Sequence, residues 1–244
     1  MIKHFRIHGD NIVECERLFN LITKSIQIQK AERFFLSPAC PSVKVTTIDS
    51  DILFFKYFPG FNKNTSDRWP SNIFQILRDN GSFLNETPDV LFTEETDDGE
   101  KILLAIEFCS ALQAGNQAWQ RSGRAYSTAR ASICPYLYII DFVKYELDKN
   151  RNRKALRFPN VAIPYSYYNA SKNWKYPAIQ VYFKSEEFQP SCDLSLQNFD
   201  ISLFGEKDVY SLLYGLIYNT DVTPIYDSLI EKSLKIMEYM TTSN

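Results

Sequence analysis

Two apolar runs separated by a helical stretch constrain the fold of this chain more than any other feature. Lys101–Phe108 and Pro135–Phe142 are rich in Ile, Leu, Phe and Tyr, which is typical of strands buried on both faces. Between them, Gln113–Ser132 is rich in Ala, lacks Pro and carries polar residues at helical spacing. A strand, a helix and a strand in this order predict an α/β protein with a central mixed β-sheet flanked by helices.

A hairpin precedes this unit. Pro88–Phe92 has the composition of a strand, and the acidic stretch ending in Asp97-Asp98-Gly99 is a turn signal. We therefore expect Pro88–Phe92 to pair with Lys101–Phe108 as antiparallel neighbours. The other expected elements are a helix capped by Asp10 and reaching about Lys30, strands at Val43–Asp49, Asp51–Phe58 and Ala178–Phe183, an irregular aromatic segment at Pro159–Pro177, and helices at Lys207–Asn219 and, capped by Thr223, on to about Met240.

Composition limits the class of protein. The chain has 244 residues, 45% of them hydrophobic, a formal net charge of -2 and no low-complexity segment, so an ordinary packed core is expected. One domain over residues 1–244 is the economical interpretation, with a core at about 10–142 and an elaboration at about 143–244. The five cysteines show no metal-ligand spacing, and no apolar run reaches 18 residues. These features predict a cytoplasmic protein without a membrane partner.

Glu107 is the most informative single residue because it stands inside an apolar strand. A buried acid needs a cationic partner or a bound cation. Across the hairpin, Asp89 is expected beside Glu107, and two carboxylates on adjacent strands suit a hard ion such as Mg²⁺. The alternatives are a strand-entry role for Asp89 and a salt bridge from Glu107 to Arg121 or Arg124.

This pattern resembles a known family. Pro88-Asp89, then Glu107-Phe108-Cys109, followed by a helix and an apolar strand, is similar to the PD-(D/E)xK nuclease core of type II restriction endonucleases. The resemblance covers roughly Asp10 to Phe142. It implies Mg²⁺-dependent hydrolysis of DNA phosphodiesters, with Asp89 and Glu107 as metal ligands. It further implies that Glu14 or Glu16 joins the metal from the first helix, although both also suit an ordinary first-turn position.

The chain departs from the family at one position. Cys109 stands where the family has a lysine. Gln113 and Gln117 are the expected substitutes, because a glutamine side chain can orient the attacking water. A glutamine cannot accept the proton of that water, so a metal-bound hydroxide or a substrate phosphate would act as the base.

A polar stripe and a basic segment indicate a nucleic-acid surface. Gln and Arg recur along the helix predicted after Glu107, and Gln117–Arg157 contains nine basic and three acidic residues. An aromatic loop at Tyr165–Tyr176 offers stacking groups. The expected contacts to double-stranded DNA are Gln120, Arg121, Arg124, Lys149, Arg151, Arg153, Lys154, Tyr167 and Lys172. A solvated helix face and a packed aromatic loop are the structural alternatives.

Three other functions fit parts of the same pattern. One is a DNA-binding protein that is no longer catalytic because the family's lysine is missing. Another is a repair or junction nuclease on the same core, and the third is an interaction protein without a nucleic-acid role. If the target is palindromic, a two-fold homodimer is expected, with the two C-terminal helices as its interface.

Overall fold

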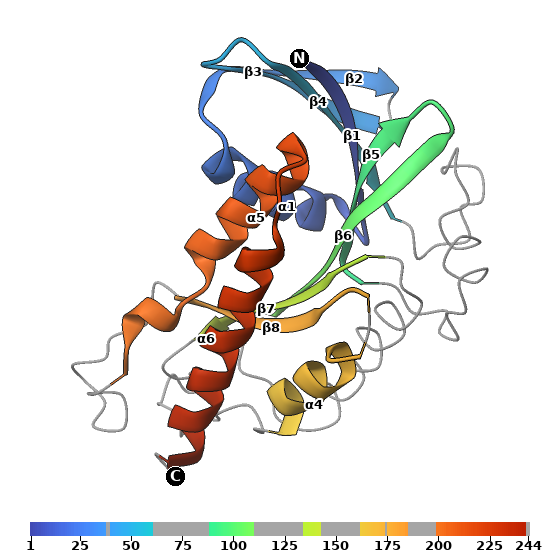
Figure 1. Ribbon diagram of the computed structural model, residues 1–244. Coiled ribbons are helices and arrows are strands. Elements are labelled where there is room, and N and C mark those ends of the chain that lie inside the picture. Colours follow the sequence, from blue (N-terminus) through green and yellow to red (C-terminus); the bar gives the residue numbers. More distant parts are fainter. Residues whose placement is uncertain are drawn as a thin grey trace, which may run out of the picture.

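The protein is described from a computed structural model, shown in Figure 1. The structure describes residues 1–37, 40–60, 88–109, 134–142, 162–173, 175–184 and 199–242. The helix predicted at Gln113–Ser132 and the basic residues of 144–157 lie outside the described residues. Most of the loop predicted at 59–71 lies outside them as well.

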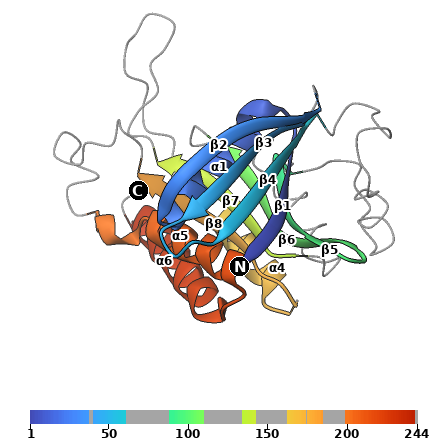
Figure 2. The same cartoon turned by 90° about the horizontal axis from the view of Figure 1, so that it is seen from above.

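A mixed sheet of eight strands forms the centre of the molecule. Its strand order is β2-β3-β4-β1-β5-β6-β7-β8, and Figure 2 shows how strongly β2, β3 and β4 curve. The α/β class and the central mixed sheet with flanking helices are thereby confirmed. The strands are β1 (Ile2–Gly9), β2 (Ile28–Ser37), β3 (Cys40–Thr47), β4 (Ile52–Pro59), β5 (Val90–Thr96), β6 (Gly99–Cys109), β7 (Tyr136–Phe142) and β8 (Ala178–Lys184).

The predicted hairpin is present as β5–β6, and β3–β4 form a second antiparallel pair. β3 and β4 are antiparallel, as are β5 and β6, and β7 lies parallel to β6. The acidic turn is tighter than expected, since β5 continues to Thr96 and β6 begins at Gly99. A parallel pair such as β6 and β7 requires a crossover connection, and residues 110–135 supply it.

Helices cover the two faces of the sheet differently (Figure 1). α1 (Ile12–Ser25), α5 (Glu206–Tyr218) and α6 (Thr223–Thr242) bury side chains in one core with the sheet. α4 (Ala162–Ser171) contacts β8 and α6. Its Tyr167 stacks on Tyr138, whose strand neighbours Leu137 and Ile139 belong to that core. Because side chains alternate along a strand, α4 covers the opposite face.

The N-terminal prediction was wrong in its boundaries. Asn11, and not Asp10, caps the helix, with its Oδ1 accepting from the amides of Val13 at 2.8 Å and Glu14 at 3.2 Å. The helix ends at Ser25, and Ile28–Lys30 instead begin β2, pairing with β3. Neither β1 nor β2 was predicted, and β2 is an exposed edge strand.

The aromatic segment was also predicted wrongly. We expected Pro159–Pro177 to be irregular, whereas Ala162–Ser171 forms α4. Tyr167 is buried there against Tyr138, at 5.9 Å between ring centroids. Tertiary packing of this ring outweighs the weak local helix propensity.

Both C-terminal helices are confirmed. Asn219 ends α5 in the left-handed conformation, with φ 55°. α6 already begins at Thr223, which does not cap it as predicted. Instead, Asp221 Oδ1 accepts from the Thr223 amide at 3.0 Å.

Gly9 joins β1 to α1 in a space too small for a side chain. A Cβ atom built there would lie 2.6 Å from Cys15 Sγ and 2.8 Å from Asn11 O. We expect Gly9→Ala to lower the free energy of unfolding by about 1–3 kcal/mol, because the start of α1 must shift. Urea denaturation followed by circular dichroism measures this loss. An unchanged midpoint would contradict the tight packing at this junction.

Candidate functional site

Asp89 and Glu107, two of the predicted catalytic residues, lie at one end of the sheet. β6 and β7 are parallel and end there, whereas the antiparallel β5 begins there. The end of β1 is paired with the start of β5, since Gly9 lies opposite Val90. The start of α1 follows directly after β1, so five elements meet at this edge.

Asp89 is positioned opposite Glu107. Val90 pairs with Ile106, and continuing this antiparallel register by one residue matches Asp89 with Glu107. The backbone oxygen of Asp89 accepts from the Asp10 amide at 2.9 Å. The side-chain Oδ2 of Asp89 accepts from the Phe108 amide at 2.8 Å. The Asp89 carboxylate is therefore held against β6, at the residue that follows Glu107.

Glu107 lies on the sheet face that α4 covers and is 0% exposed. The Tyr136 hydroxyl donates to Glu107 Oε2 at 3.4 Å. Glu107, Tyr138 and Gln180 are aligned across β6, β7 and β8, and all three are buried. A buried carboxylate in such a row carries a desolvation cost that a bound cation offsets.

Two further charged residues, Arg17 and Asp141, lie at this end of the sheet on its other face. Arg17 on α1 donates to Asp141 Oδ2 at 3.2 Å, and its guanidinium lies 4.3 Å from the Phe108 ring centroid. Burial raises the pKa of Asp141, and the nearby Arg17 charge opposes that shift. Sequence reasoning did not single out this pair, although an acid at the end of the apolar run Tyr136–Phe142 was a signal comparable to Glu107.

The structure separates the two helix acids proposed as metal ligands. Glu14 points toward Arg17, with Oε2 4.0 Å from its Nη1. Glu16 instead accepts from Arg33 on β2 at 2.5 and 3.0 Å, so its carboxylate is engaged away from Asp89. Among the described residues, no three or more His, Cys, Asp or Glu side chains form a group suited to a metal ion. The pair Asp89 and Glu107 stays a prediction, supported by the extended register of β5 and β6.

The remaining predicted site residues divide into two sets. Tyr167 is 2% exposed and packed on Tyr138, and Lys172 is exposed just after α4. Cys109 is buried beside the site. The others lie outside the described residues: Gln113, Gln117, Gln120, Arg121, Arg124, Lys149, Arg151, Arg153 and Lys154.

The Asp89 and Glu107 pair fits a hard divalent cation in its donor chemistry. Two carboxylates from adjacent strands are the usual protein contribution to a Mg²⁺ site, where waters complete the shell.

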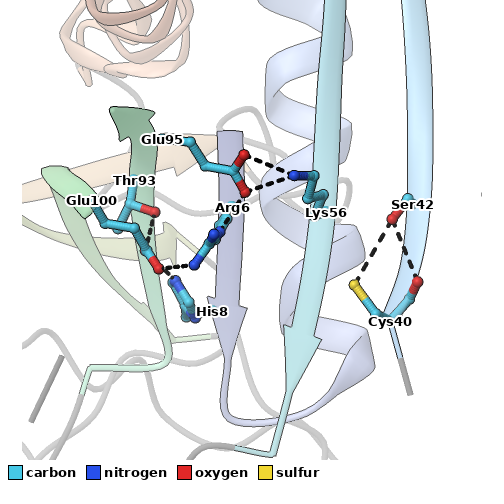
Figure 3. Close-up of polar contacts among 8 residues, drawn as sticks. All are labelled: Arg6, His8, Cys40, Ser42, Lys56, Thr93, Glu95 and Glu100. Atoms are coloured by element: carbon cyan, nitrogen blue, oxygen red, sulfur yellow. Dashed lines mark hydrogen bonds and ion pairs between the residues drawn. The ribbon is translucent and has the colours of Figure 1, made fainter. Parts of the chain in front are cut away.

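A second ionic cluster occupies the same face of the sheet nearer its middle (Figure 3). Glu100 is fully buried and accepts from Arg6, from His8 at 2.7 Å and from Thr93 at 2.7 Å. Glu95 accepts from Arg6 at 2.5 Å and from Lys56 at 2.7 Å. These pairs tie β1 to β4, β5 and β6 through side chains. We interpret these ion pairs as structural, because the positive charges of Arg6 and Lys56 neutralise the Glu95 and Glu100 carboxylates.

His8 gives the cluster a pH dependence. Burial lowers the pKa of His8 below its ordinary 6.5, although hydrogen bonding to Glu100 acts in the opposite direction. Below pH 6.5 the unfolded chain binds a proton that folded His8 resists, so stability falls as the pH drops. We expect His8→Gln to flatten this fall by up to about 1.4 kcal/mol per pH unit. Urea midpoints between pH 7.5 and 5.5 measure it, and an unchanged slope in His8→Gln would contradict the prediction.

Comparison with known proteins gave no assignment. Neither a family model, nor a curated protein, nor a solved structure matched the chain. Among the helices that the structure describes, none has both the length and the apolar character needed to cross a membrane. The proposed function therefore rests on the site and the fold.

Proposed function

We propose that the protein is a Mg²⁺-dependent, site-specific endonuclease of double-stranded DNA, similar to type II restriction enzymes. The observation that carries this proposal is the pairing of Val90 with Ile106, whose extension by one residue puts Asp89 opposite the buried Glu107. The Asp89 carboxylate accepts from the amide of Phe108, the residue after Glu107, at 2.8 Å, which supports the same arrangement.

The topology supports the same proposal. The hairpin β5–β6 is followed by a connection and by β7 parallel to β6. This is the element order on which the resemblance to the PD-(D/E)xK core rests. The antiparallel pairing of β1 with β5 adds a third strand to that unit.

The proposed roles follow from residue chemistry. Asp89 and Glu107 would hold Mg²⁺, which would stabilise negative charge at the scissile phosphate and lower the pKa of a bound water. Gln113 or Gln117 orients the attacking water in place of the missing lysine. Arg121, Arg124 and the basic residues of 149–154 contact DNA. Tyr167 is left out of this set because its ring is packed against Tyr138.

A homodimer remains part of the proposal, but the C-terminal helices are poor candidates for its interface. The apolar residues Leu212 and Leu213 of α5, and Leu229 and Ile236 of α6, are buried within the protomer. The edge strand β2 is more exposed, and Phe35 is 71% exposed there. Light scattering of the purified protein with and without DNA measures the stoichiometry.

The experiment that tests the proposed function is a digest of long DNAs of known sequence. Purified protein with Mg²⁺ should produce discrete fragments, and EDTA should abolish them. Fragment ends, once sequenced, then define the recognition site.

The other outcomes identify the rival functions. Retardation of DNA without cleavage indicates a binding protein on the same fold. Smears or nicks confined to branched DNA indicate a repair or junction nuclease. Absence of both cleavage and retardation at low salt indicates an interaction protein.

A further inference from the structure

A cavity lies near the start of β6, at the opposite end of that strand from Glu107. It has a volume of about 760 Å³ and is lined by the start of β6, the residues that precede β7 and β8, the end of α4 and the connection from α5 to α6. Its volume falls within the range of small-molecule sites, which are about 300–1,000 Å³. Lys101 and Glu107 are six positions apart on β6, so the cavity and the carboxylate pair occupy separate parts of the sheet.

The charge of this cavity is positive. Lys101, Lys172 and Lys175 line it, against a single acid, Asp227, among the lining residues that the structure describes. All three ammonium groups belong to exposed residues. In the described part of the chain, none of the three forms a salt bridge. Three lysines without acidic partners around one cavity favour an anion.

The walls are aromatic and apolar. Tyr168, Tyr176 and Tyr226 line the cavity together with Leu103 and Ile230. The Tyr226 hydroxyl is itself inaccessible to solvent, so this residue lines the cavity with other atoms than its oxygen. Such walls suit the planar or aliphatic part of a ligand.

Gly215 shapes the cavity floor. A Cβ atom there would lie 2.4 Å from Val222 Cγ1 and 3.0 Å from Thr220 Oγ1. The Thr220 amide donates to the Gly215 carbonyl at 2.9 Å. The connection between α5 and α6 is thereby held close to α5, which fixes this wall of the cavity independently of any ligand.

We propose that this cavity binds a small organic anion that carries a planar ring, such as a nucleoside monophosphate or an aromatic carboxylate. The lysines hold the anionic group, and the tyrosine and aliphatic walls enclose the ring. This proposal does not depend on the nuclease function, because none of its residues belongs to the carboxylate pair.

Calorimetric titration in EDTA tests the proposal without engaging a metal site. The probes are AMP, adenosine, inorganic phosphate and benzoate. AMP or benzoate should bind with a stoichiometry of one, and AMP should bind about tenfold or more tightly than adenosine or phosphate, since it satisfies both halves of the cavity. Whether AMP or benzoate binds more tightly distinguishes a nucleotide from a carboxylate ligand.

Variants assign the binding to this cavity. The double variant Lys172→Ala/Lys175→Ala should weaken binding about tenfold. Lys207→Ala removes an equal charge from an exposed residue on α5, outside the cavity lining, and should bind as the wild type does. The proposal is overturned if neither AMP nor benzoate binds, or if the double variant binds as tightly as Lys207→Ala.

Discussion

Replacing Glu107 with Gln should reduce Mg²⁺-dependent DNA cleavage by at least about 1,000-fold, because a metal ligand is lost at the reacting phosphate. Gln fills the same volume and can still accept from the Tyr136 hydroxyl. The variant should therefore fold, with a urea midpoint close to that of the wild type. Initial cleavage rates of supercoiled plasmid, measured over a range of Mg²⁺ concentrations, give the size of the loss.

Two companion variants sharpen this prediction. Asp89→Asn should cause a loss of similar size, because the two acids act on one ion. Glu94→Gln changes the same charge on the same hairpin, where Glu94 pairs with Lys3 at 2.8 Å, and should retain activity. Cleavage that persists in both Glu107→Gln and Asp89→Asn would remove the carboxylate pair from catalysis.

Replacing Glu100 with Ala should lower the free energy of unfolding by about 3–5 kcal/mol, because it leaves buried cationic and polar groups uncompensated. The Glu100 side chain is 0% exposed and is hydrogen-bonded to Arg6, His8 and Thr93. Urea denaturation at pH 7.5 measures the loss. If the variant is too unstable to purify, Glu100→Gln keeps the volume and should show a smaller loss.

Glu32→Ala is the matched control for this stability prediction. It also removes one carboxylate from a strand, but Glu32 pairs with Lys30 on the exposed edge strand β2. Such surface pairs contribute little, so its urea midpoint should stay at the wild-type value. Equal effects of Glu100→Ala and Glu32→Ala would show that the ionic cluster does not stabilise the sheet.

Local signals were sufficient for much of the fold. The hairpin β5–β6 follows from alternation around Asp97-Asp98-Gly99, and β7 and β8 follow from short apolar runs bounded by Pro135 and Pro177. β2 could not be predicted in this way, because nearly all of its residues are exposed and its pairing with β3 is what makes it a strand. α4 likewise depends on Tyr167 reaching Tyr138, a contact distant in sequence.

The site was predictable only in part. Asp89 and Glu107 belong to one hairpin, so the sequence places them on neighbouring strands, but counting residues back from the turn would match Asp89 with Ile106. An irregularity between Phe92 and Thr93 shifts the register by one residue and puts Asp89 opposite Glu107, and the sequence did not predict it. The engagement of Glu16 by Arg33 requires knowledge that β2 passes beside α1. The Arg17 and Asp141 pair joins residues 124 positions apart, and sequence spacing carries no information about such a contact.

Metal binding tests the central claim most directly, because it asks about the carboxylate pair without requiring turnover. Mn²⁺ takes the same oxygen ligands as Mg²⁺, and its paramagnetic resonance signal reports the free ion. With DNA present, the wild-type protein should remove Mn²⁺ from solution through a site that Asp89→Asn and Glu107→Gln each abolish and that Glu94→Gln retains. Equal Mn²⁺ binding by wild type, Asp89→Asn and Glu107→Gln would contradict the claim that these two acids hold the ion.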